Sequence, residues 1–294
     1  EGDSLSVSNV QVAGADASVA ATGDDTWTVT PVNGFIGSIS VTYDVSDGTA
    51  AASGNLDVTV IGPPGGGEFQ VNTYTLDSQQ IPSVAALLDG GFVVLWHSEN
   101  QDGSEYGVFG QRYDASGTPA GNEFQVNTYT KNYQNDPSVA ALSNGNFVVT
   151  WQSENIDGSK FGVFGQHYDA SGIPVGSEFQ VNTYTSMSQL NPSLAALSDG
   201  GFVVTWESQN QDGSSYGIFG QHYDATGASV ENEFQVNTYT NNNQLNSSVA
   251  ALTDGGFVVT WQSENQDGGG SGIFAQRYDA SGAMISEVTT ELSG

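Results

Sequence analysis

Oxygen-bearing side chains that could bind a metal ion recur four times in one short loop. Its first copy reads Ser98-Glu99-Asn100-Gln101-Asp102-Gly103. Carboxylate and amide oxygens two residues apart on a tight turn suit calcium, which takes oxygen ligands. The loop lacks the full EF-hand spacing, and Asn, Asp and Gly also fill ordinary solvated turns. The candidate ligands in these loops are Glu99, Asn100, Asp102, Glu154, Asn155, Asp157, Asn210, Asp212, Glu264, Asn265 and Asp267.

Catalytic chemistry finds less support in the residue types. The chain has three histidines, and two of them, His167 and His222, occupy a position that is Arg112 and Arg277 in the other repeats. A general base cannot be exchanged for a permanent cation, so we expect the histidines to be surface residues. No Gly-x-Ser-x-Gly nucleophile elbow occurs. Carboxylates are so abundant that their spacing cannot exclude a glycosidase, which needs only two.

A repeat of 55 residues positions these loops. The string EFQVNTYT begins at Glu68, Glu123, Glu178 and Glu233, without insertions between copies. Each repeat also holds a SVAAL or SLAAL block, a block with FVV and a tryptophan, and a block that ends in Gln-Arg/His-Tyr-Asp. The tryptophans, which could stack on sugars, lie within apolar strands, so we expect them in the core. They are Trp96, Trp151, Trp206 and Trp261.

Each block has the pattern of a β-strand. Asp89-Gly90-Gly91 is a hairpin signal between the first two blocks, and the FVV block is apolar on both faces, as expected between two packed layers. Four strands in each unit predict an all-β, β-propeller-like array, with stacked β-sandwiches as the alternative. The strand at 68–71 could complete the last blade and close a ring. A degenerate copy at 287–290 could compete with it, and the array could also be longer.

Residues 1–61 differ from the repeats and show short alternating strands typical of a small cadherin-like or immunoglobulin-like β-sandwich. Residues 62–67 read Gly-Pro-Pro-Gly-Gly-Gly and are expected to be a linker. The predicted domains are therefore 1–61, a linker at 62–67, and the four-repeat domain at 68–294. The chain opens on Glu1 rather than Met, so we expect it to be excised from something longer.

The charge balance restricts the partners. Asp and Glu total 33 against 4 Lys and Arg, a net charge of -29. Such a surface repels nucleic acid and anionic membranes but attracts divalent cations. No stretch approaches a membrane-spanning length, so membrane insertion is not expected. The expected partners are a cell-surface or extracellular glycan or protein, or neighbouring copies of the chain itself.

Two families resemble parts of the chain. The segments 1–7, 23–31 and 43–48 are similar to a bacterial cadherin-like repeat, a family found in tandem in giant exported adhesins with calcium at domain junctions. This resemblance implies Asp3, Asp44 and Asp47 as further calcium ligands. Residues 68–294 resemble the SVAALxDGGFVVTWQSxxQDG repeats of very large, calcium-dependent, type I secreted (RTX-like) bacterial proteins, which implies an extracellular or cell-surface location.

We therefore expect a non-catalytic module of a large secreted surface protein that serves adhesion or structural display, with calcium adding rigidity. The alternatives are a multivalent, lectin-like glycan-binding propeller and a polysaccharide-active enzyme domain. In a meandering blade, the turns after the first and third strands share one end of the blade. The loops after the second and fourth strands share the other end, where we expect ligands, because the loops between repeats differ most there.

Overall fold

The computed structural model describes residues 5–14, 17–23, 26–32, 37–60 and 68–285. Every regular element among them is a β-strand, which confirms the all-β prediction. Within these ranges no helix is long and apolar enough to cross a membrane. Two compact units divide the chain: Glu1–Gln70 with Tyr113–Thr118, and Val71–Arg112 with Pro119–Gly294. The linker expected at 62–67 lies outside the described residues.

The first unit contains the five strands that the alternating pattern predicts. They form a three-stranded sheet in the order β1-β4-β5 and a separate hairpin, β2-β3. Ile39 and Val41 on β4 are buried in the three-stranded sheet, at 2% and 4% exposure. The strands are β1 (Ser6–Val12), β2 (Ala17–Gly23), β3 (Thr26–Pro31), β4 (Gly37–Ser46) and β5 (Ala51–Val60).

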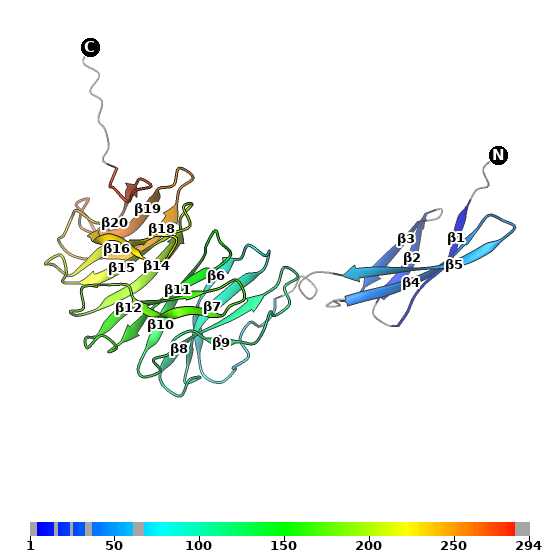
Figure 1. Cartoon of the computed structure of the whole chain (residues 1–294), viewed down its shortest axis with the longest axis horizontal. Coiled ribbons are helices and arrows are strands. Elements are labelled where there is room, and N and C mark those ends of the chain that lie inside the picture. The colour runs from blue at the N-terminus through cyan, green and yellow to red at the C-terminus, as the bar shows by residue number, and fades with distance from the viewer. Residues whose placement is uncertain (1–4, 15–16, 24–25, 33–36, 61–67, 286–294) are drawn as a thin grey trace, which may run out of the picture. The chain divides into compact units, whose positions relative to one another are not determined.

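The second unit is a series of four small antiparallel sheets, the blades, which Figure 1 shows in chain order. Each blade is a meander whose strands pair with their neighbours in sequence. The first three blades have four strands and the fourth shows three among the described residues. The strands are β6 (Gln79–Ala86), β7 (Phe92–Glu99), β8 (Tyr106–Tyr113), β9 (Phe124–Gln125), β10 (Gln134–Ala141), β11 (Phe147–Glu154), β12 (Phe161–Tyr168), β13 (Pro174–Gln180), β14 (Gln189–Ala196), β15 (Phe202–Gln209), β16 (Tyr216–Tyr223), β17 (Ser229–Gln235), β18 (Gln244–Ala251), β19 (Phe257–Glu264) and β20 (Ser271–Tyr278).

The core lies between blades, and each layer joins the forward face of one blade to the backward face of the next. Between the first two blades, Leu87, Val93 and Val108 pack with Val149 and Trp151. The same layer recurs between the second and third and between the third and fourth blades. The four repeated tryptophans are at most 5% exposed, which confirms that they are core residues. The apolar strands of the middle blades are thus buried on both faces, as their sequence predicts.

Polar contacts tie successive blades together near the innermost strands. Each innermost strand carries a bulge with a residue at positive φ. In the second, third and fourth blades, the backbone N–H of that residue donates to the preceding blade. Asn191 donates to Gln152 Oε1 at 2.8 Å, and Asn246 donates to Glu207 Oε1 at 2.6 Å. The second of these buried contacts uses a carboxylate where the first uses an amide.

The expected fourth strand is shorter than the repeated string EFQVNTYT. In the second blade, β13 ends at Gln180, and Asn182 turns inward to 3% exposure. Its Oδ1 accepts from the backbone N–H of Val163 at 2.7 Å, and its Nδ2 donates to Tyr184 O at 2.9 Å. The asparagine side chain replaces the next rung of the backbone ladder, so the strand ends and the chain crosses to the next blade.

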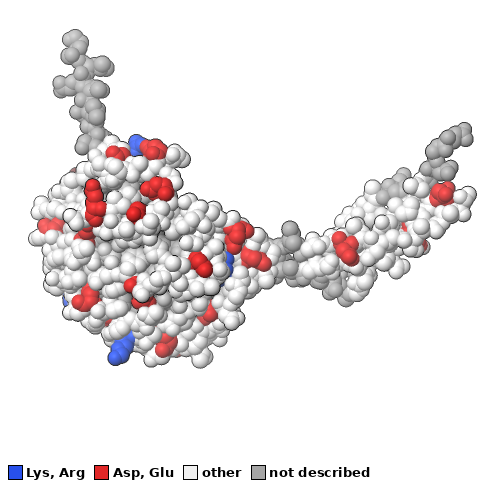
Figure 2. Space-filling view, viewed as in Figure 1, with Lys and Arg blue, Asp and Glu red and all other residues white. Residues whose placement is uncertain are grey.

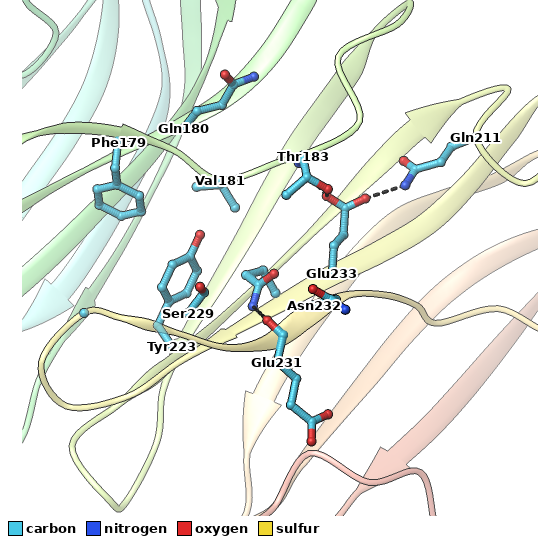
Figure 3. A pocket seen from close by; sticks show the side chains of 12 residues that line it. Phe179, Gln180, Val181, Thr183, Gln211, Tyr223, Ser229, Glu231, Asn232 and Glu233 are labelled. Carbon is cyan, nitrogen blue, oxygen red and sulfur yellow. Dashed lines mark hydrogen bonds between the residues drawn. The ribbon is translucent and has the colours of Figure 1, made fainter.

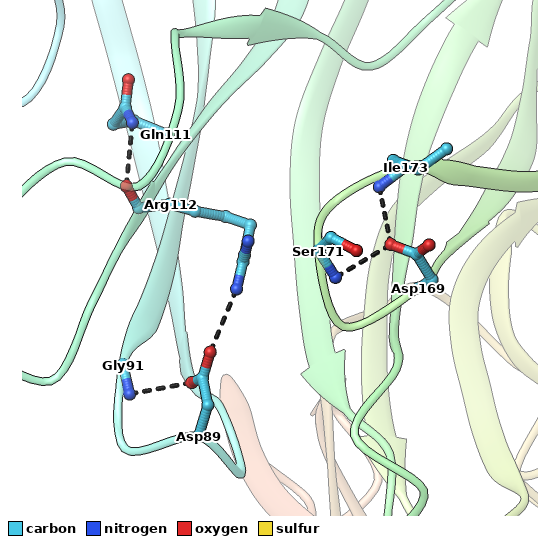
Figure 4. A network of polar contacts seen from close by, with 7 residues as sticks. All are labelled: Asp89, Gly91, Gln111, Arg112, Asp169, Ser171 and Ile173. Atoms are coloured by element: carbon cyan, nitrogen blue, oxygen red, sulfur yellow. Dashed lines mark hydrogen bonds and ion pairs between the residues drawn. The ribbon is translucent and has the colours of Figure 1, made fainter.

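The connections gather at two ends of the blades, as the meander predicts. At one end, Arg112 Nη2 donates to Asp89 Oδ2 at 3.1 Å and joins the first hairpin turn to the third strand (Figure 4). At the other end, the backbone N–H of Glu99 donates to Ser78 O at 2.8 Å. The loop after each second strand therefore lies beside the loop that enters the blade.

Candidate functional site

The predicted calcium loops are held together by their own side chains. The asparagines adopt left-handed backbone angles, with Asn100 at φ 58° and Asn155 at φ 63°. Asp157 Oδ1 accepts from the backbone N–H of Ser159 at 3.0 Å, and its Oδ2 accepts from Gln180 Nε2 at 3.0 Å. A Cβ on Gly162 would lie 2.7 Å from that Oδ2, so the repeated glycine makes room for the aspartate.

The equivalent loops repeat this arrangement with small changes. Asp102 accepts from Gln125 Nε2 at 3.0 Å, whereas Asp212 accepts from Asn237 Nδ2 at 3.3 Å. Asp267 accepts from the backbone N–H of Gly269 at 3.4 Å, and Glu264 accepts from Asn243 Nδ2 at 3.0 Å. The other loop candidates lie at the ends of the second strands or directly after them: Glu99, Glu154, Asn210 and Asn265.

The candidates in the first unit lie in two places. Asp44 accepts from Asn9 Nδ2 at 2.8 Å and from Ser53 Oγ at 2.6 Å, and these bonds lower the pKa of its carboxyl. Asp47 accepts from the backbone of Ala50 and from Thr49, which lowers its pKa to about 2. Asp3 lies outside the described residues. Across all described ranges, no group of three or more His, Cys, Asp or Glu side chains is placed to hold a metal ion. Calcium binding therefore stays a prediction.

The expectation that the histidines are surface residues is wrong for two of them. His97 and His222 are 4% and 6% exposed, because both lie between blades. Burial lowers the pKa of His97 to about 4, and its Nδ1 accepts from the backbone N–H of Asp136 at 3.3 Å. A Cβ on Gly227 of the third blade would lie 2.8 Å from His167 Nε2. The Arg/His position therefore fills space against the following blade, which explains why both residue types fit.

A pocket of about 590 Å³ opens between the second and third blades. Figure 3 shows the rings of Phe179 and Tyr223 at one side of it, 5.6 Å apart and edge to face. Thr183, Gln211 and Glu233 lie at the other side. Burial and the charge of Glu233 raise the pKa of the Tyr223 phenol, so it stays neutral and can donate a hydrogen bond. Further polar lining comes from Gln180, Gln221, Ser229, Glu231 and Asn232.

The two carboxylates of the pocket have different surroundings. Glu233 Oε2 accepts from the backbone N–H of Thr183 at 2.7 Å and from its Oγ1 at 3.0 Å, and Oε1 accepts from Gln211 Nε2. The same set of bonds recurs in the first blade, where Glu123, beside β9, accepts from the backbone N–H and Oγ1 of Thr73 and from Gln101 Nε2. Glu233 is therefore also part of the contact between blades. The carboxylate of Glu231 extends away from Glu233 in Figure 3.

Glu231 stands where the first and second repeats have glycine and the fourth has Ser286. Its backbone is left-handed, with φ at 59°, and the equivalent Gly121 and Gly176 have φ of 89° and 73°. A side chain in this region costs roughly 1 kcal/mol or more, and such residues cluster at functional sites. This pocket was not predicted from the sequence. The signal in the sequence was the carboxylate of Glu231 at a position that is Gly121, Gly176 and Ser286 in the other repeats.

The chain was compared with known proteins. Residues 1–61 match the model of the cadherin-like domain family. No curated protein matches the sequence. Among solved structures, a protein of unknown function from Dyadobacter fermentans DSM 18053 is similar at a TM-score of 0.54 and 10% identity, over 92% of this chain and 84% of that one.

Two further structures come from Bacteroides thetaiotaomicron VPI-5482. An endo-arabinase is similar at a TM-score of 0.44 and 13% identity, over 86% of this chain and 90% of that one. An endo-1,4-beta-xylanase is similar at a TM-score of 0.44 and 12% identity, over 96% of this chain and 95% of that one.

The expectation of a non-catalytic adhesion or display module, and hence of no enzyme, is contradicted by this comparison, since enzymes that act on polysaccharides are prominent among the similar structures. That expectation is withdrawn. At these identities the likeness shows the fold alone and assigns no activity to this chain. Its repeats form a propeller-like array of β-sheets, and residues 1–61 match the cadherin-like domain family.

Proposed function

We propose that this chain recognises a neutral polysaccharide in the pocket between its second and third blades. The observation that carries the proposal is the lining itself, in which two aromatic rings face a wall of amide, hydroxyl and carboxylate groups. Sugars have apolar ring faces and many hydroxyls, and a few well-placed polar groups on an apolar wall suit them. The pocket volume is within the range of ligand sites.

The negative charge of the chain disfavours anionic polysaccharides as ligands. Asp and Glu side chains are scattered over the face seen in Figure 2, and few Lys or Arg side chains accompany them. The pocket itself contains two carboxylates and no cationic side chain. Because a surface with a net charge of -29 repels anions, uronic-acid and sulfated polysaccharides are poor ligands and neutral glycans are favoured.

Cleavage of the bound glycan is a second candidate function, and the presence of both Glu231 and Glu233 in one pocket favours it. Glycoside hydrolysis needs a pair of carboxyl groups on either side of the glycosidic bond. Glu233 is fixed by its bonds to Thr183 and Gln211. In this role Glu231 supplies the free carboxyl group and Glu233 the fixed one.

Binding to a panel of neutral and anionic polysaccharides tests the main proposal. Arabinan, xylan and β-glucan are expected to retard the full chain in affinity electrophoresis, and polygalacturonate is not. Ser229→Trp fills the pocket and should abolish retardation, whereas Ser177→Trp, on the exposed outer strand of the second blade, should leave it unchanged. Equal retardation of the two variants, or no retardation by any neutral glycan, would contradict the proposal.

Release of reducing ends tests the second candidate. Glu231→Gln should keep the glycan bound but stop its cleavage, and Glu105→Gln, an exposed carboxylate outside the pocket, should cleave at the wild-type rate. Binding without reducing ends from the wild-type chain would leave recognition as the function and remove hydrolysis.

One sequence-based expectation supports an extracellular setting for this function. The likeness of residues 68–294 to repeats of large, calcium-dependent, type I secreted proteins supports a place outside the bacterial cell, where polysaccharides are available. The partner that follows from the pocket is an extracellular or cell-surface glycan. Calcium binding by the loops after the second strands would add rigidity to the blades that form the pocket.

A further inference from the structure

The two ends of the blade array present apolar side chains that are buried everywhere else in the repeats. Ile273 in the fourth blade is 77% exposed, whereas its equivalents Val163 and Ile218 are fully buried. Val84 in the first blade is 65% exposed, whereas its equivalent Val139 is 8% exposed. The fourth blade therefore has a bare forward face and the first blade a bare backward face.

Strand burial shows the same difference. In the second blade, β11 and β12 are buried almost without interruption. In the fourth blade, β19 and β20 alternate strictly between more and less exposed positions, although β19 has the same sequence as β11. An identical strand pattern with one side uncovered means that a layer is missing from that side. Among the described residues, the inner strands pack in series, β6 on β10, β10 on β14 and β14 on β18, and β18 does not pack back on β6 in this way.

The two bare faces are complementary to each other. Inside the array, every forward face meets a backward face of the same composition. The forward face of the fourth blade and the backward face of the first blade are the same two surfaces without their partners. A cavity of about 150 Å³ between Pro82, Val94 and Trp96 also opens in the first blade. What fits each bare face is thus another blade of this repeat.

We propose that a second copy of this chain covers both faces, so that two four-blade arrays close into one ring with two-fold symmetry. The first blade of each copy would pack on the fourth blade of the other. Such heterologous contacts form a closed assembly when the rotation closes. Propellers have about four to eight blades. Two copies supply twice four blades, which is within that range, and three copies would exceed it.

A strand would be exchanged in this ring. In the fourth blade the chain's own pairing with β20 is seen at Met284, which bridges Tyr278, and at Ile285, whose N–H donates to Arg277 O at 2.9 Å. Further along the outer edge, the register of the first blade pairs Phe109 with Gln125 and Gly110 with Phe124. The equivalent pairing joins Phe274 and Ala275 of one copy to Gln70 and Phe69 of the other.

The sequence after β20 departs from the repeated string at this point. Where the other repeats have Glu-Phe-Gln-Val in register, this chain has Val-Thr-Thr-Glu at 288–291. Phe69, by contrast, already lies against Tyr113 with ring centroids 5.4 Å apart, as Phe124 lies against Tyr168 at 5.6 Å. Phe69 thus occupies the place of an outer-strand residue from a preceding blade.

Polar groups at the bare faces match in the same way. The contacts between Gln152 and Asn191 and between Glu207 and Asn246 join the second strand of one blade to the inner strand of the next. Gln262 in the fourth blade is equivalent to the acceptors Gln152 and Glu207. Ile81 in the first blade is equivalent to the donors Asn191 and Asn246 and shares their positive φ, at 50°. In the ring, Gln262 Oε1 of one copy accepts from the backbone N–H of Ile81 in the other.

The mass of the full chain in solution tests the proposal. Multi-angle light scattering in 0.15 M salt, which screens the repulsion between acidic copies, should give twice the chain mass of 30.7 kDa. Ile273→Asp and Val84→Asp each place a charge on one bare face and should reduce the mass to that of one chain. Because both side chains are exposed within one copy, far-UV circular dichroism should show the same β-structure.

Ile173→Asp is the matched control. Ile173 is 61% exposed in a turn outside both bare faces, so this variant should keep the doubled mass. Phe69→Ser should weaken the pair without unfolding either copy, because it removes the ring of the exchanged strand. A single-chain mass for the wild-type protein up to high micromolar concentration, a mass above two chains, or dissociation of Ile173→Asp equal to that of Ile273→Asp would each overturn the proposal.

Discussion

The side chain of Asn127 accepts a hydrogen bond from the backbone N–H of Val108 through Oδ1, at 2.7 Å. The same bond joins Asn182 to Val163 and Asn237 to Ile218, and each of these asparagines donates to a buried glutamine that opens the next blade. A single polar side chain thus ends the outer strand of one blade and fixes the start of the following one. The asparagine in the repeated string is therefore a structural residue.

Asn182→Leu should destabilise the array strongly. The leucine leaves the N–H of Val163 and Oε1 of Gln189 without this partner, and each buried polar group left unpaired costs about 1–3 kcal/mol. Chemical denaturation should show this loss as a lower midpoint with a similar slope. Asn122→Leu, in the exposed segment that leads into β9, is the control and should change stability little. Equal effects of the two substitutions would mean that the buried network contributes nothing.

His97→Gln should remove part of the loss of stability in acid. Burial lowers the pKa of His97 from 6.5 to about 4, so the folded state disfavours the charged imidazole. The stability of the neutral site is complete above about pH 6.5 and is lost as the pH falls toward 4. Protonated Nδ1 also could no longer accept from Asp136. The difference in melting temperature, variant minus wild type, should therefore rise from pH 7 to pH 4. A difference that does not change with pH would contradict this role of His97.

Glu207→Gln should stabilise the chain near neutral pH. Glu207 is 3% exposed, and burial raises the pKa of its carboxyl although the N–H of Asn246 opposes this. A raised carboxyl pKa means that stability is greatest in acid and is lost as the pH rises through that pKa. A glutamine can still accept from Asn246, as Gln152 does from Asn191. The melting temperature should rise at pH 7 and change less at pH 4, and Gln152→Glu should show the opposite sign.

Calcium removal should lower the melting temperature by several degrees if the acidic loops bind the ion. A ligand that binds only the folded state stabilises it by mass action. Melting curves in millimolar calcium and in EGTA give the comparison. Alanine substitution of Asp102, Asp157, Asp212 and Asp267 together should abolish the difference. If the wild-type curve is unchanged by EGTA, the oxygens of these loops serve only the internal bonds described above.

The repeat and its strands could be predicted because they depend on local pattern. Hairpin signals such as Asp89-Gly90-Gly91 and strands that are apolar on both faces fix a four-stranded unit and a core between layers. The burial of the repeated tryptophans followed from the same pattern. These features depend on the residue types within one repeat, which the sequence displays four times.

The contacts between repeats could not be predicted in the same way. His97 is buried because the bulge at Asp136 in the next blade comes to it, and no feature within one repeat shows this. The outer strand ends early because an asparagine side chain competes with the backbone ladder. The pocket is lined by Phe179 and Tyr223, which belong to different blades, and by Glu231, which departs from the glycine of the first two repeats. The non-catalytic function was predicted wrongly for the same reason, since that prediction rested on the residues that the repeats share.

A crystal structure of the chain with a bound neutral oligosaccharide is the most direct test of the proposed function. Arabinan, xylan and β-glucan fragments that bind in affinity electrophoresis would be soaked in turn. We expect sugar density between Phe179 and Tyr223 on one side and Gln211 and Glu231 on the other, with a ring face against the aromatic wall. Density confined to the loops after the second strands, or none at saturating ligand, would contradict the account.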